Sequence, residues 1–257
     1  MARRILTSFL AALIGVAASS AAGQIVTERN VRAEMYFLAS DAMQGRGSAS
    51  PYERVAAEYI GSQFMQFGLE PAGDAGFDGK PTFVQAVAFK RRNGDEGKTY
   101  NAIGKIGGTD RTLSSQIILI TSHLDHLGVR DNAPGDDKIF NGADDDASGS
   151  VAVLELARTL ATGKRPRRTV YFVCFGSEEI GGFGARYFVE YLPFAKEKLV
   201  ANLEFEMIGR PDTAVKPGEL WLTGYDRSDL GPELAKRGAS LVADPHPEDR
   251  KSTRLNS

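Results

Sequence analysis

The sequence predicts an α/β fold in which a twisted, mixed and largely parallel sheet carries helices on both faces. Residues 116–120 and 169–175 are two continuous apolar runs, typical of strands that a sheet buries on both sides. Segments with helical spacing of apolar residues alternate with such strands, which is the pattern of an α/β sheet. The 257 residues, 42% of them hydrophobic and 25% charged, are enough for one main core.

The N-terminal half of the chain supplies two helices and two outer strands. Apolar residues at helical spacing predict helices over residues 30–38 and 52–67, and Gly68 is placed to end the second one. After a turn-rich stretch, short apolar runs predict outer strands over residues 83–89 and 99–106.

From residue 116 onward, strands and helices alternate. The strand at 116–120 is followed by a long polar loop, and residues 147–161 then show helical spacing. Residues 169–175 form the next buried strand. The remaining predicted elements are a helix over residues 183–192 and two further strands of the sheet over residues 199–205 and 219–222.

Residues 1–23 have the three-part layout of a secretory signal peptide. Arg3 and Arg4 precede an apolar run over residues 5–18, and small residues follow it. A membrane anchor is the weaker interpretation, because the run is shorter than the roughly 20 residues that span a bilayer. We therefore expect an exported protein, periplasmic or secreted, that has no membrane association after cleavage.

The C-terminal residues 250–257 are polar and unpatterned, and we expect them to be a non-native tail. The main domain is then expected over residues 24–249.

The formal net charge of −2 and the lack of a basic patch argue against a nucleic-acid partner. Cys174 is the only cysteine, so no internal disulfide can form, and its apolar strand predicts a core residue rather than a catalytic thiol.

Candidate metal ligands begin directly after the strand at 116–120. In an α/β sheet, sites gather at the carboxyl ends of strands. His123 could bind a metal while the carboxylate of Asp125 holds its other ring nitrogen. Taken alone, this arrangement is also typical of a surface loop.

Three consecutive carboxylates, Asp144, Asp145 and Asp146, precede the helix predicted at 147–161. Asp146 could cap that helix, but capping does not require all three. A divalent cation would convert their mutual repulsion into binding energy. The spacing of a calcium-binding EF-hand loop is not met.

Two further strand ends carry glutamates. Glu178 and Glu179 follow the strand at 169–175, and Glu206 comes directly at the end of the one at 199–205. Neighbouring side chains in a loop point in different directions, so one glutamate could bind a metal while the other faces its bound water. Alternatively, both only favour the start of the next helix. Together with histidine and aspartate, these ligand types suit zinc.

In combination and in this order, these motifs resemble the co-catalytic di-zinc aminopeptidases, a family related to the catalytic domain of glutamate carboxypeptidase and more distantly to glutaminyl cyclases. The resemblance covers about residues 30–248. It implies a zinc-exopeptidase-like fold and removal of N-terminal residues from a peptide substrate by a metal-activated water. It rests on residues 38–46, 122–126, 142–149, 177–179 and 202–210.

The resemblance also implies metal-binding roles for four side chains. Asp145 would bridge two zinc ions. His123 and Glu206 would complete the protein ligands of one ion, and Glu179 would bind the other.

Two more roles and one backbone feature follow from the same resemblance. Glu178 would be the general base, and Asp125 would orient His123. The peptide bond between Asp145 and Asp146 would be cis, which is rare outside proline.

The sequence departs from the family pattern in two places. The family usually has aspartate where this chain has Glu206. It also takes a histidine ligand for the second zinc from a loop well beyond residue 250, and His246 does not match that motif. We therefore expect the domain to be truncated at its C-terminus and the fragment to be poorly active.

Three alternative functions remain open. A glutaminyl cyclase or a carboxypeptidase could share the fold, although the DDDASG run of residues 144–149 favours the di-zinc peptidases over the cyclases. A metal-binding module without catalysis is the alternative from another class. Dependence of turnover on Glu178 would separate an enzyme from such a module.

Overall fold

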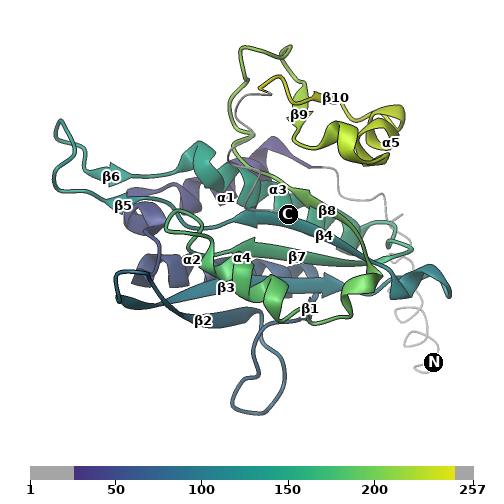
Figure 1. The fold of residues 1–257 in the computed structure, drawn as a ribbon, viewed down its shortest axis with the longest axis horizontal. Helices are drawn as coiled ribbons and strands as arrows, with labels where there is room; N and C mark the ends of the chain where they lie inside the picture. Colours follow the sequence, from purple (N-terminus) through teal and green to yellow (C-terminus); the bar gives the residue numbers. More distant parts are fainter. Residues whose placement is uncertain (1–25, 247–257) are drawn as a thin grey trace, which may run out of the picture.

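The computed structural model describes residues 26–246 (Figure 1). The predicted signal peptide, residues 1–23, and the predicted tail, residues 250–257, lie outside the described residues. Among the helices of residues 26–246, none has the length and apolar character needed to cross a bilayer.

A six-stranded mixed sheet forms the centre of the molecule, as predicted. β7 (Thr169–Phe175), β4 (Ile117–His123) and β8 (Leu199–Glu204) are adjacent and parallel. β3 (Glu96–Ile106) runs antiparallel to β7, and its other edge pairs with β1 (Glu70–Pro71) and β2 (Val84–Lys90). The two predicted outer strands are therefore confirmed as the β2–β3 hairpin.

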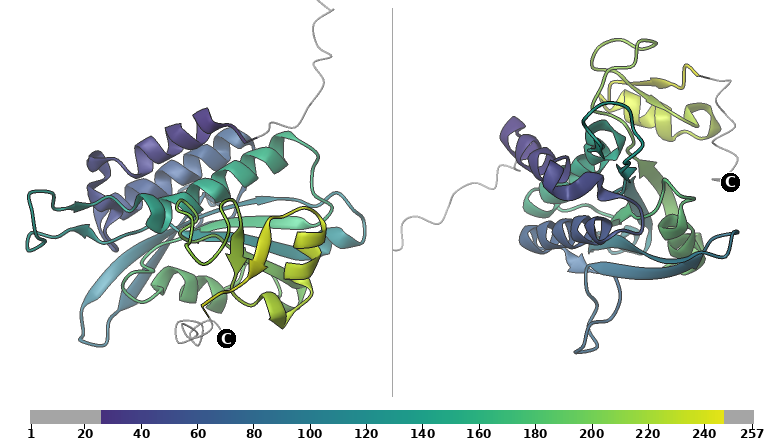
Figure 2. Two further views of the ribbon diagram at one scale, coloured as in Figure 1. Left: turned by 90° about the horizontal axis from the view of Figure 1, so that it is seen from above. Right: turned by 90° about the vertical axis from the view of Figure 1, so that its left-hand side faces the viewer.

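Helices cover both faces of the sheet (Figure 2). α1 (Glu28–Leu38), α2 (Pro51–Phe67) and α3 (Gly149–Thr162) lie on one face, and α4 (Phe183–Glu190) lies on the other. The Ser50 hydroxyl caps α2 by accepting the N–H groups of its first turn. Gly68 ends α2 in the left-handed conformation, as predicted.

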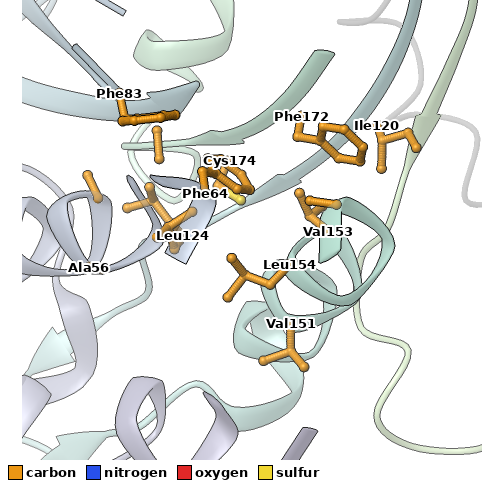
Figure 3. Close-up of a cluster of buried hydrophobic side chains, with 14 of the residues drawn as sticks. Ala56, Phe64, Phe83, Ile120, Leu124, Val151, Val153, Leu154, Phe172 and Cys174 are labelled. Atoms are coloured by element: carbon orange, nitrogen blue, oxygen red, sulfur yellow. The ribbon is translucent and has the colours of Figure 1, made fainter. Parts of the chain in front are cut away.

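The strands bury alternate residues against these two layers. On the face of α1, α2 and α3, Phe64 and Leu154 pack with Phe172 and Cys174 (Figure 3). On the face of α4, Phe188 packs against a second set that includes residues of β3, β4 and β7. Burial raises the pKa of the Cys174 thiol to about 12, which confirms a core cysteine.

The expectation that residues 219–222 add a strand to the main sheet was wrong. β9 (Leu220–Leu222) instead pairs in parallel with β10 (Leu241–Ala243), and α5 (Leu230–Lys236) connects the two. Leu220 and Trp221 remain exposed, so this run lacks the two-sided burial of a main-sheet strand.

The polar loop after β4 also holds a small hairpin of β5 (Gly128–Val129) and β6 (Ile139–Phe140). Short helical turns complete the structure: η1 (Asp41–Arg46), η2 (Leu113–Ser115), η3 (Ala143–Ser148), η4 (Lys196–Lys198) and η5 (Tyr225–Arg227).

The order of the parallel strands places a site at the carboxyl end of β4. The chain passes from β4 through α3 to β7 on one side, and then through α4 to β8 on the other side. The loops leaving β4 and its neighbours therefore diverge at this edge, where α/β sheets bind their ligands.

Candidate functional site

The side chain of Asp145 stands between two imidazoles. Its Oδ1 lies 3.0 Å from Nε2 of His123, and its Oδ2 lies 3.8 Å from Nδ1 of His126. His123 is the last residue of β4 and Asp145 lies in η3, just before α3. The Asp145 side chain keeps 32% of its surface exposed, so the group opens to solvent. Each oxygen of the Asp145 carboxylate therefore faces a different imidazole.

A second contact adds Glu179 to His123, His126 and Asp145, and these four residues are called the acidic group below. Its Oε1 lies 2.7 Å from Nδ1 of His126. One donor atom each from His126, Asp145 and Glu179 lie within 4.8 Å of one another, and within residues 26–246 this is the single set of three or more such donors. The structure therefore unites Asp145, Glu179 and His123 as the sequence suggested, and adds His126.

Buried polar atoms without a hydrogen-bond partner are concentrated here. Of the six such side-chain atoms in the described part of the chain, four belong to this group: Nδ1 and Nε2 of His123, Nδ1 of His126 and Oε1 of Glu179. Leaving a buried polar atom unpaired costs about 1–3 kcal/mol. A cation would satisfy one lone pair from each of His123, His126 and Glu179, and these nitrogen and oxygen ligands are those zinc accepts. The residues present therefore fit a zinc site.

The electrostatics of His123 also favour a positive charge at this place. Burial by itself lowers the pKa of the imidazole, but Asp125, Asp145 and Asp146 outweigh burial and raise it well above the usual value. The same interaction with His123 lowers the pKa of Asp145. The carboxylates thus hold a strongly negative field around the imidazole.

Asp125 contacts the loop that carries Glu178 and Glu179, here called the glutamate loop, more closely than it contacts His123. Its Oδ1 lies 3.6 Å from Nδ1 of His123, which is longer than a hydrogen bond. Its two oxygens accept the backbone N–H groups of Glu178 at 3.0 Å and Glu179 at 3.3 Å, and also the Ser48 hydroxyl. The fully buried carboxylate therefore fixes the two glutamates relative to the end of β4.

Glu178 lies exposed at the mouth of the group, directly after β7. Partial desolvation and the nearby carboxylates of Asp125, Glu206 and Glu179 raise its pKa, while His123 lowers it. A raised pKa improves a carboxylate as a proton acceptor.

Glu206 lies just beyond the end of β8 and is exposed. Desolvation raises its pKa, and His123 and Asp145 act on its charge, so it lies close to the group. However, it makes no ion pair and does not join the three converging donors within residues 26–246. The structure therefore places Glu206 beside the group rather than in it.

The loop that carries Glu206 is tied to the start of α3. The N–H of Met207 donates to Asp146, that of Ile208 to Ser148 and that of Gly209 to Asp144. These bonds set the direction in which the chain leaves β8.

Asp146 acts as a buried structural carboxylate. It accepts the N–H groups of His123, Gly149 and Met207, and so joins the ends of β4 and β8 to the first turn of α3. Burial raises its pKa to about 8. The peptide bond between Asp145 and Asp146 is cis, which confirms the expectation drawn from the resemblance.

Two buried charged residues behind the site were not identified from the sequence. The Arg46 guanidinium donates to the carbonyls of Leu38, Leu124, Asn141 and Gly142, and burial lowers its pKa to about 10. It thereby binds the loop after β4 to the loop before α3. Its place in the motif of residues 38–46 was the available signal.

Glu53 of α2 is the second of these residues. It accepts hydrogen bonds from Thr99 and Ser177 and has no exposed surface. Because Ser177 directly precedes Glu178, this contact anchors the glutamate loop from the side of α2. Burial raises the pKa of Glu53 to about 7.

His246, which does not match the family's ligand motif, lies elsewhere. Its Nε2 pairs with Asp212 at 2.8 Å, and its ring contacts Trp221 edge-on.

Two curated relatives resemble part of this chain. The leupeptin-inactivating enzyme 1 of Streptomyces exfoliatus is 36% identical over 115 residues, which is 44% of this chain and 23% of that protein. An aminopeptidase of Pseudomonas aeruginosa is 34% identical over 118 residues, which is 45% of this chain and 19% of that protein. The chain thus spans less than a quarter of either relative.

The fold is shared with a solved structure. A Zn-dependent exopeptidase from Parabacteroides distasonis superposes with a TM-score of 0.58 at 17% identity, covering 91% of this chain and 83% of that one. The model of Peptidase family M28 matches residues 101–253, a segment that contains all the expected metal-binding and catalytic residues. Because this match spans more than half of the sequence, the chain belongs to peptidase family M28.

Proposed function

We propose that this chain carries the catalytic centre of a zinc-dependent exopeptidase that removes N-terminal residues from peptides. The observation that carries the proposal is the group of buried, unpartnered atoms around Asp145, namely Nε2 of His123, Nδ1 of His126 and Oε1 of Glu179, with Glu178 beside them. The membership in peptidase family M28 and the two relatives named above agree with it.

The proposed site holds two zinc ions. Asp145 would lie between them, with His123 and Glu206 on one side and Glu179 on the other. Bound divalent ions supply polarisation of the scissile carbonyl and a lower pKa for an attacking water.

Glu178 would then act as the general base. Its carboxylate accepts a proton from the attacking water as the new C–O bond forms, and returns that proton to the leaving amine as the C–N bond breaks. Asp125 supports this role by holding the Glu178 backbone through its N–H. Such a positioned base contributes about 10²–10⁴-fold to the rate.

The charges at the mouth favour a free amine over a free carboxylate in the substrate. Glu178 and Glu206 are exposed there, and Asp145 is partly exposed. Nearby Arg210 lies 3.8 Å from the carboxylate of Asp144. Of Glu178, Glu206 and Asp145, only Glu178 is not an expected zinc ligand, and its charge favours the α-ammonium group of an N-terminal residue over a C-terminal carboxylate.

Blocked substrates test the proposal directly. A dipeptide amide with a free amine should be hydrolysed, whereas the same dipeptide with an acetylated amine should not. Hydrolysis that instead requires a free carboxylate would indicate a carboxypeptidase, and ring closure of an N-terminal glutamine would indicate a cyclase. Zinc binding without any turnover would favour the remaining alternative, a metal-binding module without catalysis.

We also propose that the protein acts outside the cytoplasm, in the periplasm or after secretion. The basic and apolar layout of residues 1–23 supports this proposal. N-terminal sequencing of the protein recovered from fractionated cells tests it. A start near residue 24 is the expected result, and recovery of the uncleaved chain from the cytoplasm would contradict it.

A further inference from the structure

The ring of His126 is fixed by contacts that are independent of the rest of the acidic group. Its backbone N–H donates to the carbonyl of Arg46, and its own carbonyl accepts the N–H of Ser48. On the other side the ring packs on Gly142, where an added Cβ would lie 2.6 Å from the His126 Cγ. Only 11% of the side chain is exposed. The fold therefore holds this imidazole in one orientation.

That orientation directs Nδ1 at two carboxylates. Oε1 of Glu179 lies at 2.7 Å and Oδ2 of Asp145 at 3.8 Å. Although these atoms are close, neither His126 Nδ1 nor Glu179 Oε1 has a hydrogen-bond partner within residues 26–246. Ligands around one tetrahedral zinc ion, each about 2.0–2.2 Å from it, lie about 3.3–3.6 Å from one another. The distances of His126 Nδ1 from Glu179 and from Asp145, 2.7 Å and 3.8 Å, bracket that value.

The two oxygens of Asp145 divide the site between the two histidines. Oδ1 faces His123 and Oδ2 faces His126. If Asp145 bridges two ions, each ion then has its own imidazole, one from the last residue of β4 and one from the loop that follows it.

We propose that Nδ1 of His126 is a ligand of the second zinc ion, together with Asp145 and Glu179. This inference rests on the proposed zinc site and adds to it a ligand that the sequence motifs did not assign. It gives the second ion three protein donors within residues 26–246. Nδ1 of His126 faces carboxylate oxygens rather than a backbone group or apolar side chains.

Metal binding by single variants tests the assignment. Zinc stoichiometry and affinity would be measured by calorimetry on the metal-stripped protein for the wild type, His126→Ala, Glu179→Gln and His246→Ala. The wild type should bind two ions. His126→Ala and Glu179→Gln should each weaken one of them at least tenfold, since removal of even an outer hydrogen-bond partner of a metal ligand reaches about 10–100-fold. His246→Ala should bind both ions as the wild type does.

Thermal unfolding of the metal-stripped variants controls for loss of the fold. If His126→Ala does not fold, His126→Asn replaces it, and nitrogen NMR of the histidine-labelled wild type provides a readout that needs no variant. Zinc addition should move the resonance of the His126 Nδ1 nucleus.

The outcomes separate this inference from the proposed function. Two ions bound with unchanged affinity in His126→Ala, or a His126 Nδ1 resonance that zinc does not move, would overturn the ligand assignment and leave the zinc site standing. A wild type that binds no zinc would overturn both.

Discussion

The carboxylate of Asp125 accepts the backbone N–H of Glu178 at 3.0 Å, and so joins the end of β4 to the loop that follows β7. The same carboxylate accepts the N–H of Glu179 and the hydroxyl of Ser48. Asp125, which the resemblance assigned to orient His123, therefore fixes the backbone of Glu178, the expected general base, and of Glu179, an expected zinc ligand.

Asp125→Asn should weaken this junction. An amide offers one acceptor oxygen in place of two and turns an NH₂ group toward one of the three donors. We expect the free energy of unfolding to fall by about 1–3 kcal/mol, and kcat to fall more than KM rises, because the base loses its position. Chemical denaturation and steady-state kinetics measure both. Ser48→Ala, which removes one donor only, should have the smaller effect, and equal effects of the two variants would contradict this role.

Arg46→Lys should destabilise the protein despite keeping the charge. The guanidinium serves four carbonyls in a fully buried position, and an ammonium group has only three N–H donors in another geometry. We expect a loss of about 2–4 kcal/mol in the free energy of unfolding. Arg92→Lys, in an exposed turn, should stay within about 0.5 kcal/mol of the wild type. Wild-type stability in Arg46→Lys would contradict a stabilising role for these four hydrogen bonds.

Glu34 makes the stability of the metal-free protein depend on pH. This glutamate of α1 is only 6% exposed, and burial followed by repulsion from Glu155 raises its pKa from 4.5 to about 8, although Arg158 lowers it. Between these values the folded protein keeps a proton that the unfolded chain releases. The unfolded state binds fewer protons in this window, so the free energy of unfolding falls as pH rises through it.

Glu34→Gln removes this titration. The variant should match the wild type near pH 4.5 and exceed it at pH 8 by about 1–3 kcal/mol, since each unit of pKa shift corresponds to about 1.4 kcal/mol and the interior relaxes partly. Urea denaturation at the two pH values measures the difference. Glu58→Gln, exposed on α2, should show no such divergence with pH. A parallel pH dependence in Glu34→Gln and the wild type would show that the carboxylate does not retain its proton.

The central strands were predictable because burial on both faces leaves a composition that needs no tertiary information. The runs that became β4 and β7 contain almost no polar residue before the strand end, and the left-handed Gly68 marked the end of α2 in the same local way. The short β9 carries no such information, since exposed Leu220 and Trp221 do not specify which strand it pairs with.

The residues of the site likewise fall into those that the sequence could predict and those that it could not. Histidine and carboxylates at successive strand ends were visible in sequence order, because parallel strands bring their carboxyl ends together. His126 donates its N–H to the Arg46 carbonyl and packs its ring on Gly142, while the Arg46 side chain is buried against carbonyls from three separate segments. Hydropathy predicts an exposed arginine, so this contact could be found only in the folded chain.

Zinc-dependent turnover and its reliance on Glu178 test the central claim most directly. The metal-stripped protein would be titrated with zinc while hydrolysis of an unblocked aminoacyl substrate is followed, in the wild type and in Glu178→Gln. We expect activity to appear with bound zinc, and the variant to bind the same zinc while turning over about 10²–10⁴-fold more slowly. Activity that is independent of zinc, or unchanged in Glu178→Gln, would contradict the account.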